Sequence, residues 1–442
     1  MSVSEYRWIG KPVKINEDLG PIRGRGIYLD DIELPNTAYM AYLRSPLAHA
    51  RIKKIDVSKA KSLKGVIAVY TGEDISKLLN PFPQISPNSK IIDYPLAVKK
   101  VRYFGEPVAV VVAEDKYVAE DATHLIDVEY EPLPAVIDPK KALEKNAPLV
   151  HEENGSNIVW HGIWNLGDIE EAFKQADEII EEELHFERYI PAPLETNIVI
   201  GNYDDINDIY VIYTNNVMPM FTIPLITAAL NISPDKIRMI VPPNVGGSFG
   251  GKIINYTHMT LAALLSRLVK RPVKYVETRT ENISSGTHTN ERIFNVKVAV
   301  KRDGTILGIK IKAIDNCGAY PRYEPAGAVI WSQVTHGMYR VRNIYVEFYQ
   351  VMTNKGPTGP VRGYSRIQHN FMWERIIDII ARKLGLDPVD VRLKNYIRPE
   401  EMPYEGPSGV IYDGGDYING IKLLLKELEY EKWRELQKEY RN

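Results

Sequence analysis

The sequence has 442 residues, 44% of them hydrophobic and 25% charged, which is typical of a folded globular protein with two or three domains. A formal net charge of −2 argues against a broad nucleic-acid-binding surface. The single cysteine, Cys317, excludes an internal disulfide and any zinc site or iron–sulfur cluster held by cysteines of this chain alone. The sequence contains no apolar run long enough to span a bilayer and no signal-peptide pattern, so we expect a cytoplasmic protein without a membrane partner.

The first 150 residues have the pattern of an α/β domain. Short apolar runs between turn residues predict strands at 39–43, 66–70 and 107–113. An acidic, alanine-bearing stretch predicts a helix at 116–124. A polar stretch at 140–160 indicates a boundary, so we expect one domain over residues 1–150 and a second over 151–442.

The second part mixes strands and helices. Two alternating arms on either side of a turn at 302–305 predict a hairpin over 293–313. The other predicted elements are a short helix, a charged strand, an amphipathic helix ending at Gly385 and a C-terminal helix, at 168–176, 178–188, 371–384 and 421–441. The predicted fold class is therefore α+β.

The strongest local signal is a glycine-rich loop at residues 245–252 (Val-Gly-Gly-Ser-Phe-Gly-Gly-Lys). A strand-like run precedes the loop at 237–242, and a helical pattern follows at 257–269. Backbone N–H groups at such a junction can face an anion. Two other interpretations stay open on spacing alone: a tight turn without a ligand, and a P-loop that binds a nucleotide. Ile253 counts against the P-loop because it stands where a Ser or Thr hydroxyl should bind Mg²⁺.

The glycine loop resembles the Gly-Gly-Gly-Phe-Gly-Gly-Lys loop of molybdenum hydroxylases, with Ser248 in place of one glycine. Seven further stretches are similar to this family in the same order, at 24–31, 42–51, 101–113, 193–196, 270–274, 318–320 and 386–395. The chain thus resembles the N-terminal half of the molybdopterin-binding large subunit of the xanthine dehydrogenase/aldehyde oxidase family, as in carbon monoxide and aldehyde dehydrogenases. The resemblance implies a hammerhead-like α/β domain followed by the first molybdenum-cofactor-binding domain of mixed sheets and helices.

The resemblance also assigns roles to the glycine loop. It implies that Phe249 lies against the active-site face of a molybdopterin cofactor. It further implies that Gly247, Ser248 and Gly250 contact this cofactor through their backbone.

A second segment, at 359–366 (Gly-Pro-Val-Arg-Gly-Tyr-Ser-Arg), resembles the family's Arg-Gly segment. The resemblance implies that Arg362 and Gly363 line the metal centre and that Tyr364 contacts the substrate. An always-protonated guanidinium suits an anionic oxo or sulfido centre. The alternative for Arg362 is an ordinary surface ion pair.

Departures from the family patterns narrow the substrate class. Gly363 stands where carbon monoxide dehydrogenases carry a copper-holding cysteine, which argues against that activity. Ile253 stands where purine-oxidising members carry a glutamate, so we expect it to line a pocket for a less polar substrate, an aldehyde or an aromatic heterocycle. The family's glutamine at the metal is absent, and Asn216 or Val217 aligns with its place.

The family's second molybdopterin-binding domain, which supplies a Gln-Gly segment and the catalytic glutamate, has no match in this sequence. Glu195 is a local candidate for the base, with a structural role through backbone hydrogen bonds as the alternative. The leading hypothesis is a split enzyme that hydroxylates its substrate with oxygen from water, using a separate chain for the second domain. The resemblance implies the cytosine dinucleotide form of molybdopterin, with FAD and [2Fe–2S] clusters on partner subunits. A non-catalytic remnant or scaffold and a nucleotide binder are the alternatives.

The nine histidines are scattered, and none pairs with another at metal-ligand spacing. We therefore expect no metal held by protein side chains. His258, one turn beyond the glycine loop, could approach the cofactor or be a packed histidine.

Overall fold

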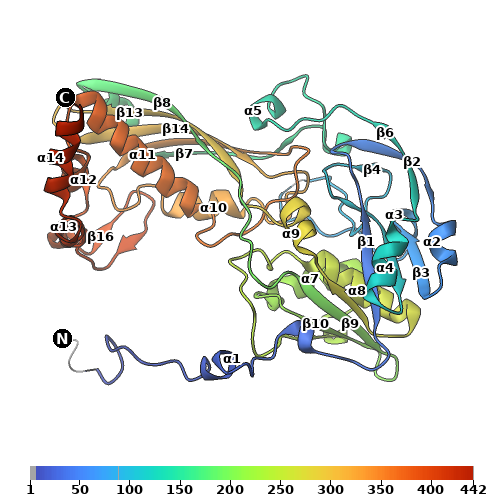
Figure 1. Ribbon diagram of the computed structural model, residues 1–442. Helices are drawn as coiled ribbons and strands as arrows, with labels where there is room; N and C mark the ends of the chain where they lie inside the picture. The colour runs from blue at the N-terminus through green and yellow to red at the C-terminus, as the bar shows by residue number, and fades with distance from the viewer. Residues whose placement is uncertain (1–5, 88, 442) are drawn as a thin grey trace.

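The computed structural model describes residues 6–87 and 89–441, which form a mixed α/β architecture around two large sheets (Figure 1). A seven-stranded sheet and a five-stranded sheet lie in separate parts of the molecule. The glycine loop follows the strand Ile237–Ile240 of the first sheet, and the Arg-Gly segment follows the strand Asn343–Val351 of the second. Within the described ranges, no helix combines the length and apolar character needed to cross a membrane.

The seven-stranded sheet joins both halves of the chain. Its order is β11-β10-β9-β12-β1-β5-β3, and β1 pairs in parallel with β12 through Ala38 and Val273. The sheet therefore runs across the boundary expected near residue 150. Its strands are β1 (Ala38–Arg44), β3 (Val66–Thr71), β5 (Pro107–Ala113), β9 (Ile198–Asp204), β10 (Ile209–Thr214), β11 (Ile237–Ile240) and β12 (Val273–Val276).

Helix α8 (Tyr256–Val269) packs on β9 and β12 in this sheet and carries much of its apolar core. Helix α7 (Pro219–Leu230) packs beside α8. The strands predicted at 39–43, 66–70 and 107–113 are confirmed as β1, β3 and β5. All seven residues of β5 are buried, which explains its continuous apolar run.

A smaller sheet of order β4-β2-β6 completes the N-terminal region. Its strands are β2 (Ala50–Asp56), β4 (Lys100–Val101) and β6 (Asp127–Pro132). The helix predicted at 116–124 is confirmed as α4 (Lys116–Thr123), whose N-cap Asp115 accepts a hydrogen bond from the Val118 N–H. The remaining helices before β7 are α1 (Leu19–Ile22), α2 (Ser58–Ser62), α3 (Gly72–Ser76) and α5 (Pro139–Ala142).

The five-stranded sheet has the order β7-β15-β14-β13-β8. The predicted hairpin is confirmed, because β13 and β14 pair in antiparallel register from Glu291–Asn316 to Val300–Ile306. Strands of this sheet are β7 (Ile158–Leu166), β8 (Glu178–Phe186), β13 (Glu291–Val300), β14 (Ile306–Asn316) and β15 (Asn343–Val351). Its core contains Phe294, Trp331, Phe348 and Trp373, from the sheet and from helices α10 (Ala326–Gln333) and α11 (Arg366–Leu384).

The remaining elements of the second half are α6 (Ile169–Lys174), α9 (Arg279–Ser285), α12 (Pro388–Asn395), and a short hairpin of β16 (Tyr404–Glu405) and β17 (Ile411–Tyr412). Helix α11 ends at Gly385, as predicted, but begins five residues earlier than expected. The single helix predicted at 421–441 is wrong. The chain forms α13 (Tyr417–Glu427) and α14 (Tyr430–Arg441), because Glu429 adopts a left-handed backbone with φ of 49°.

Candidate active site

The glycine loop lies between β11 and α8 and approaches the Arg-Gly segment closely. The Arg362 N–H donates to the Phe249 carbonyl at 2.6 Å. A Cβ added at Gly250, where φ is +101°, would lie 2.3 Å from the Pro360 carbonyl oxygen. Only glycine fits this approach, so the two segments singled out by the sequence form one structural unit.

A buried ion pair between Lys252 and Glu195 anchors the glycine loop. Glu195 Oε2 accepts hydrogen bonds from the Gly246 N–H at 2.8 Å and from Lys252 Nζ at 2.6 Å. The Lys252 side chain is 1% exposed, and burial lowers its pKa, an effect that the bond to Glu195 partly offsets. Glu195 thus has the structural role that was the alternative to a catalytic base.

The hydroxyl of Ser248 shapes the turn of the loop. Its Oγ accepts from the N–H groups of Gly250 at 3.2 Å and Lys252 at 3.3 Å. Within the described residues, the N–H groups of Gly247, Ser248 and Phe249 have no hydrogen-bond partner in the protein. Gly247 and Ser248 therefore offer the backbone donors expected of them, whereas the N–H of Gly250 is already bonded.

Phe249 and Arg362 are both exposed at this junction. Phe249 is 49% exposed and has a left-handed backbone with φ of 50°. The Arg362 guanidinium has no ion-pair or hydrogen-bond partner among the residues that the structure describes, so it is not the ordinary surface ion pair considered above. Gly363 has φ of +79° and is also exposed. A set of unpaired backbone N–H groups and one free guanidinium fits an anionic group.

Tyr364 lies at the other side of the Arg-Gly segment, in the interior. Its hydroxyl donates to Glu324, and its ring stands edge-on to Tyr323 with centroids 5.3 Å apart. Burial, followed by the Glu324 charge, raises the pKa of Tyr364 well above its usual range. The hydroxyl is therefore a fixed, protonated donor to Glu324, and substrate contact through the ring stays a prediction.

Glu324 is the centre of a buried polar network. Its two oxygens also accept from Asn290 Nδ2 at 2.9 Å, from the Gly327 N–H at 3.1 Å and from Gln350 Nε2 at 2.5 Å. Burial raises the pKa of Glu324, and the nearby Asp315 carboxylate raises it further.

A fully buried arginine supports the same segment. Arg292 Nε donates to Asp315 at 2.8 Å, both side chains being wholly inaccessible, and Arg292 Nη2 donates to the Ser365 hydroxyl at 3.0 Å. Ser365 has a left-handed backbone with φ of 61° directly before α11. The sequence analysis missed Arg292. The available signal was a charged residue in phase with the apolar residues Phe294 and Val296 on one strand.

The residues that align with the family's glutamine do not reproduce its expected role. Asn216 is buried, and its Nδ2 donates to the carbonyls of Lys252 at 2.7 Å and Ile253 at 3.1 Å. Its amide is thus used to hold the chain behind the glycine loop. Val217 is exposed, and Ile253 lies in the apolar core under α8, so its role in a substrate pocket remains a prediction.

His258 is a packed histidine. Its Nδ1 lies 3.0 Å from the Tyr42 hydroxyl in a hydrogen bond, and its ring lies between Tyr42 and Tyr275. Burial lowers its pKa to about 3.

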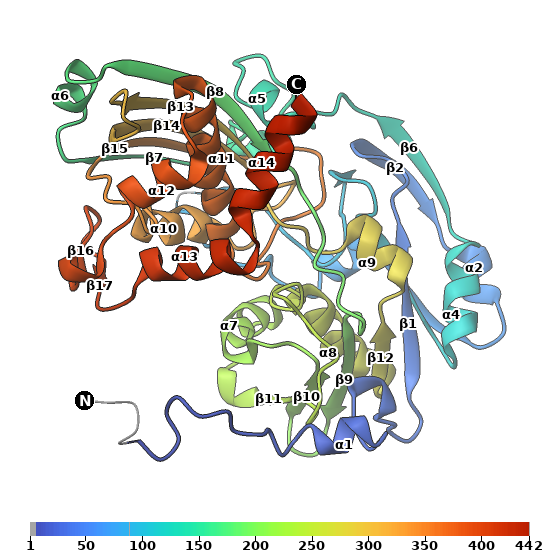
Figure 2. The same ribbon diagram turned by 60° about the vertical axis from the view of Figure 1, so that its left-hand side comes forward.

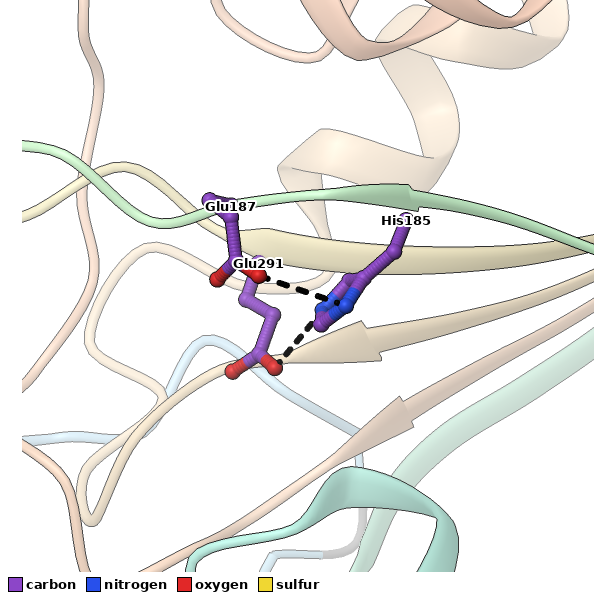
Figure 3. A group of neighbouring side chains, drawn as sticks. All are labelled: His185, Glu187 and Glu291. Atoms are coloured by element: carbon purple, nitrogen blue, oxygen red, sulfur yellow. Dashed lines mark hydrogen bonds and ion pairs between the residues drawn. The ribbon is translucent and has the colours of Figure 1, made fainter.

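A second polar cluster joins the ends of β8 and β13. His185 lies between two glutamates, with Nε2 3.0 Å from Glu291 and Nδ1 3.3 Å from Glu187 (Figure 3). Lys355 Nζ also contacts Glu291 at 2.6 Å and supplies a positive charge, so the cluster forms an ion-pair network.

Comparison with known proteins agrees with this architecture. Residues 23–134 match the aldehyde oxidase and xanthine dehydrogenase a/b hammerhead domain, and residues 150–396 match the molybdopterin cofactor-binding domain. The structure of quinoline 2-oxidoreductase from Pseudomonas putida 86 is similar with a TM-score of 0.90 and 33% identity, over 98% of this chain and 56% of that one.

Two curated relatives differ in how much of their length is matched. The carbon monoxide dehydrogenase large chain of Hydrogenophaga pseudoflava is 34% identical over 95% of this chain but only 54% of its own length. The nicotinate dehydrogenase large molybdopterin subunit of Eubacterium barkeri is 30% identical over 88% of this chain and 90% of its own length. The chain thus spans about half the length of the Hydrogenophaga pseudoflava relative and nearly all of the Eubacterium barkeri relative. It belongs to the large-subunit family of xanthine dehydrogenase and aldehyde oxidase, and comprises a hammerhead domain and a first molybdopterin-binding domain.

Proposed function

We propose that this chain is one half of a split molybdenum hydroxylase that oxidises an aldehyde or an aromatic heterocycle with oxygen from water. A separate chain brings the second molybdopterin-binding domain and the catalytic glutamate, and flavin and [2Fe–2S] subunits accept the electrons. The observation that carries this proposal is the Phe249–Arg362 junction, where exposed anion donors stand on two segments tied by one backbone hydrogen bond.

The donor set at this junction fits the molybdenum cofactor, in the cytosine dinucleotide form that the family resemblance implies. The N–H groups of Gly247 and Ser248 and the guanidinium of Arg362 would hold its anionic ligands, with the Phe249 ring against it. When bound, the cofactor supplies the two-electron oxidation of a substrate carbon. Arg362 is exposed without a partner, so its charge is available to position the group.

The division into two chains is supported by the lengths of the relatives. The Eubacterium barkeri protein, whose name calls it a subunit, is matched over 90% of its length. The quinoline and nicotinate relatives favour an aromatic heterocycle over an aldehyde as the substrate.

The geometry of Lys252 counts against nucleotide binding. A P-loop lysine must reach the β- and γ-phosphates. Here the ammonium group is buried and bonded to Glu195 at 2.6 Å, so the loop resembles a P-loop only in spacing.

The test is the molybdenum content of the native protein, isolated from its own source with whatever copurifies. We expect about one molybdenum per copy and a second large polypeptide that carries the missing domain, as the family's single-site architecture requires. Arg362→Ala should lower the molybdenum content, whereas Arg302→Ala, at an exposed hairpin turn, should not. A protein that purifies alone and without molybdenum would refute the proposal and favour the scaffold interpretation.

A further inference from the structure

The N-terminal arm, defined as residues 7–26, extends away from both sheets. Figures 1 and 2 show it running along one side of the molecule, from the region of β10 toward the side where β16 and α13 lie. Its only regular element is the four-residue helix α1. Within the described residues, the hydrogen bonds of the arm stay inside the arm itself.

The arm exposes an unusual amount of apolar surface. Six large side chains in it are between 52% and 79% exposed: Trp8, Ile9, Val13, Ile15, Leu19 and Ile22. Isolated exposed apolar residues are normal on any protein, but a contiguous set marks an interaction surface. Within the described residues, the backbone hydrogen bonds of the arm are local turns and none joins it to a sheet, so its exposed apolar side chains are available to a partner.

The arm is joined to the body beside the glycine loop. The Ile27 N–H donates to Asn244 Oδ1 at 2.9 Å, and the Asn244 N–H donates back to the Ile27 carbonyl at 3.2 Å. Asn244 directly precedes the loop that begins at Val245. Two further exposed apolar residues are Val241 and Leu194, and Leu194 directly precedes Glu195, whose carboxylate bonds the Gly246 N–H of the loop.

We propose that the N-terminal arm is a clamp that docks on the chain carrying the second molybdopterin-binding domain. This inference rests on the proposed function. It commits to that partner because the arm leaves the body at the cofactor loop, which the second domain must cover to complete the site. The chain spans only 54% of the length of its carbon monoxide dehydrogenase relative, and under the proposed function a separate chain carries the second domain.

The composition of the arm defines the surface that it would bind. It carries five basic side chains (Arg7, Lys11, Lys14, Arg23 and Arg25) and two acidic ones (Glu17 and Asp18), although the whole chain has a net charge of −2. The partner surface is therefore an apolar groove with an acidic border.

The experiment measures binding of the full chain to the polypeptide that carries the second molybdopterin-binding domain, purified separately, with analytical ultracentrifugation of the chain alone. The test variant is Ile15→Ser/Ile22→Ser in the arm. The matched control is Ile163→Ser/Ile179→Ser, on the two edge strands of the five-stranded sheet, where the side chains are 54% and 51% exposed. We expect the arm variant to weaken binding at least about tenfold and the control to leave it unchanged.

The outcomes separate this inference from the function on which it rests. If the unaltered chain does not bind the partner, the proposed function fails. If the unaltered chain binds and the arm variant binds equally well, the clamp is refuted while the split enzyme stands. Self-association of the chain alone that the arm variant abolishes would assign the arm to a second copy and overturn the proposal.

Discussion

The glycine loop and the Arg-Gly segment meet at one hydrogen bond, but they are supported differently. The glycine loop is held by the ion pair of Glu195 and Lys252, by the hydroxyl of Ser248 and by the Asn216 amide behind it. The Arg-Gly segment rests on a buried network in which Arg292 and Glu324 bond Ser365 and Tyr364.

The two segments therefore differ in how their positions are fixed. The Arg-Gly segment has a fixed position because each of its buried polar anchors is held by several partners. The glycine loop leaves the N–H groups of residues 247–249 without a partner among the described residues, so a bound anion would add contacts that the protein does not supply. The following predictions test this contrast, beginning with the largest expected effect.

Removing the buried ion pair that supports the Arg-Gly segment should lower the free energy of unfolding the most. Arg292→Met leaves the Asp315 carboxylate buried without its cation, so we expect a loss of about 3–5 kcal/mol in the free energy of unfolding. Lys297→Met, on the same strand, removes an exposed pair with Glu181 and should cost less than about 1 kcal/mol. Urea denaturation of both variants measures the difference, and equal losses would contradict the contrast.

Removing the ion pair that anchors the glycine loop should lower the free energy of unfolding by a smaller amount. Lys252→Met leaves Glu195 with only the Gly246 N–H, and we expect a loss of about 2 kcal/mol. Hydrogen exchange should become faster at the amides of residues 246–252 while the amides of α11 stay protected. The control is Lys236→Met, whose partner Asp208 is exposed. If the amides of α11 exchange faster to the same extent as those of the loop, the anchors of the two segments are not independent.

Acid should lower the stability of the folded protein, because each of the two segments is followed by a buried neutral histidine. Burial lowers the pKa of His258 on α8 and of His369 on α11 to about 3 each. The unfolded chain takes up these protons near pH 6.5, so stability falls as the pH drops from there toward 3, by about 1.4 kcal/mol per pH unit for each histidine. His258→Asn keeps an acceptor near Tyr42 and should reduce the slope of melting temperature against pH. An unchanged slope would show that His258 does not contribute.

The smallest effect concerns backbone strain in the loop. Phe249 is half exposed and left-handed, so Phe249→Gly should be more stable than Phe249→Ala by about 1 kcal/mol. Gly363→Ala should be less stable than the unaltered protein for the same reason, because it places a Cβ at a φ of +79°. Urea midpoints of the three variants test this. A more stable Phe249→Ala would mean that the strain is absent.

Much of the fold could be predicted where one local rule governs a segment. The apolar run of β5, the hairpin of β13 and β14 and the end of α11 at Gly385 follow from periodicity and turn chemistry. The C-terminal helix could not be predicted correctly, because the turn at Glu429 depends on one left-handed residue without a glycine to signal it.

The candidate site was predictable only in part. The meeting of the glycine loop and the Arg-Gly segment was implied by the family resemblance, and the Phe249–Arg362 hydrogen bond shows it. The anchors of these segments are long-range partners whose separation in the chain has no local signature. Asn290 and Glu324 lie in two different loops, and the bond between them exists only in the folded protein.

The parallel pairing of β1 with β12 has a consequence for how the chain folds during synthesis. Ala38 and Val273 are neighbours in the sheet but are separated by 235 positions in the sequence. At a ribosomal rate of about 5–20 residues per second, β1 waits roughly 10–50 s for its partner strand. During that interval the nascent N-terminal domain has an open strand edge, whose unpaired N–H and C=O groups are a template for pairing with another chain.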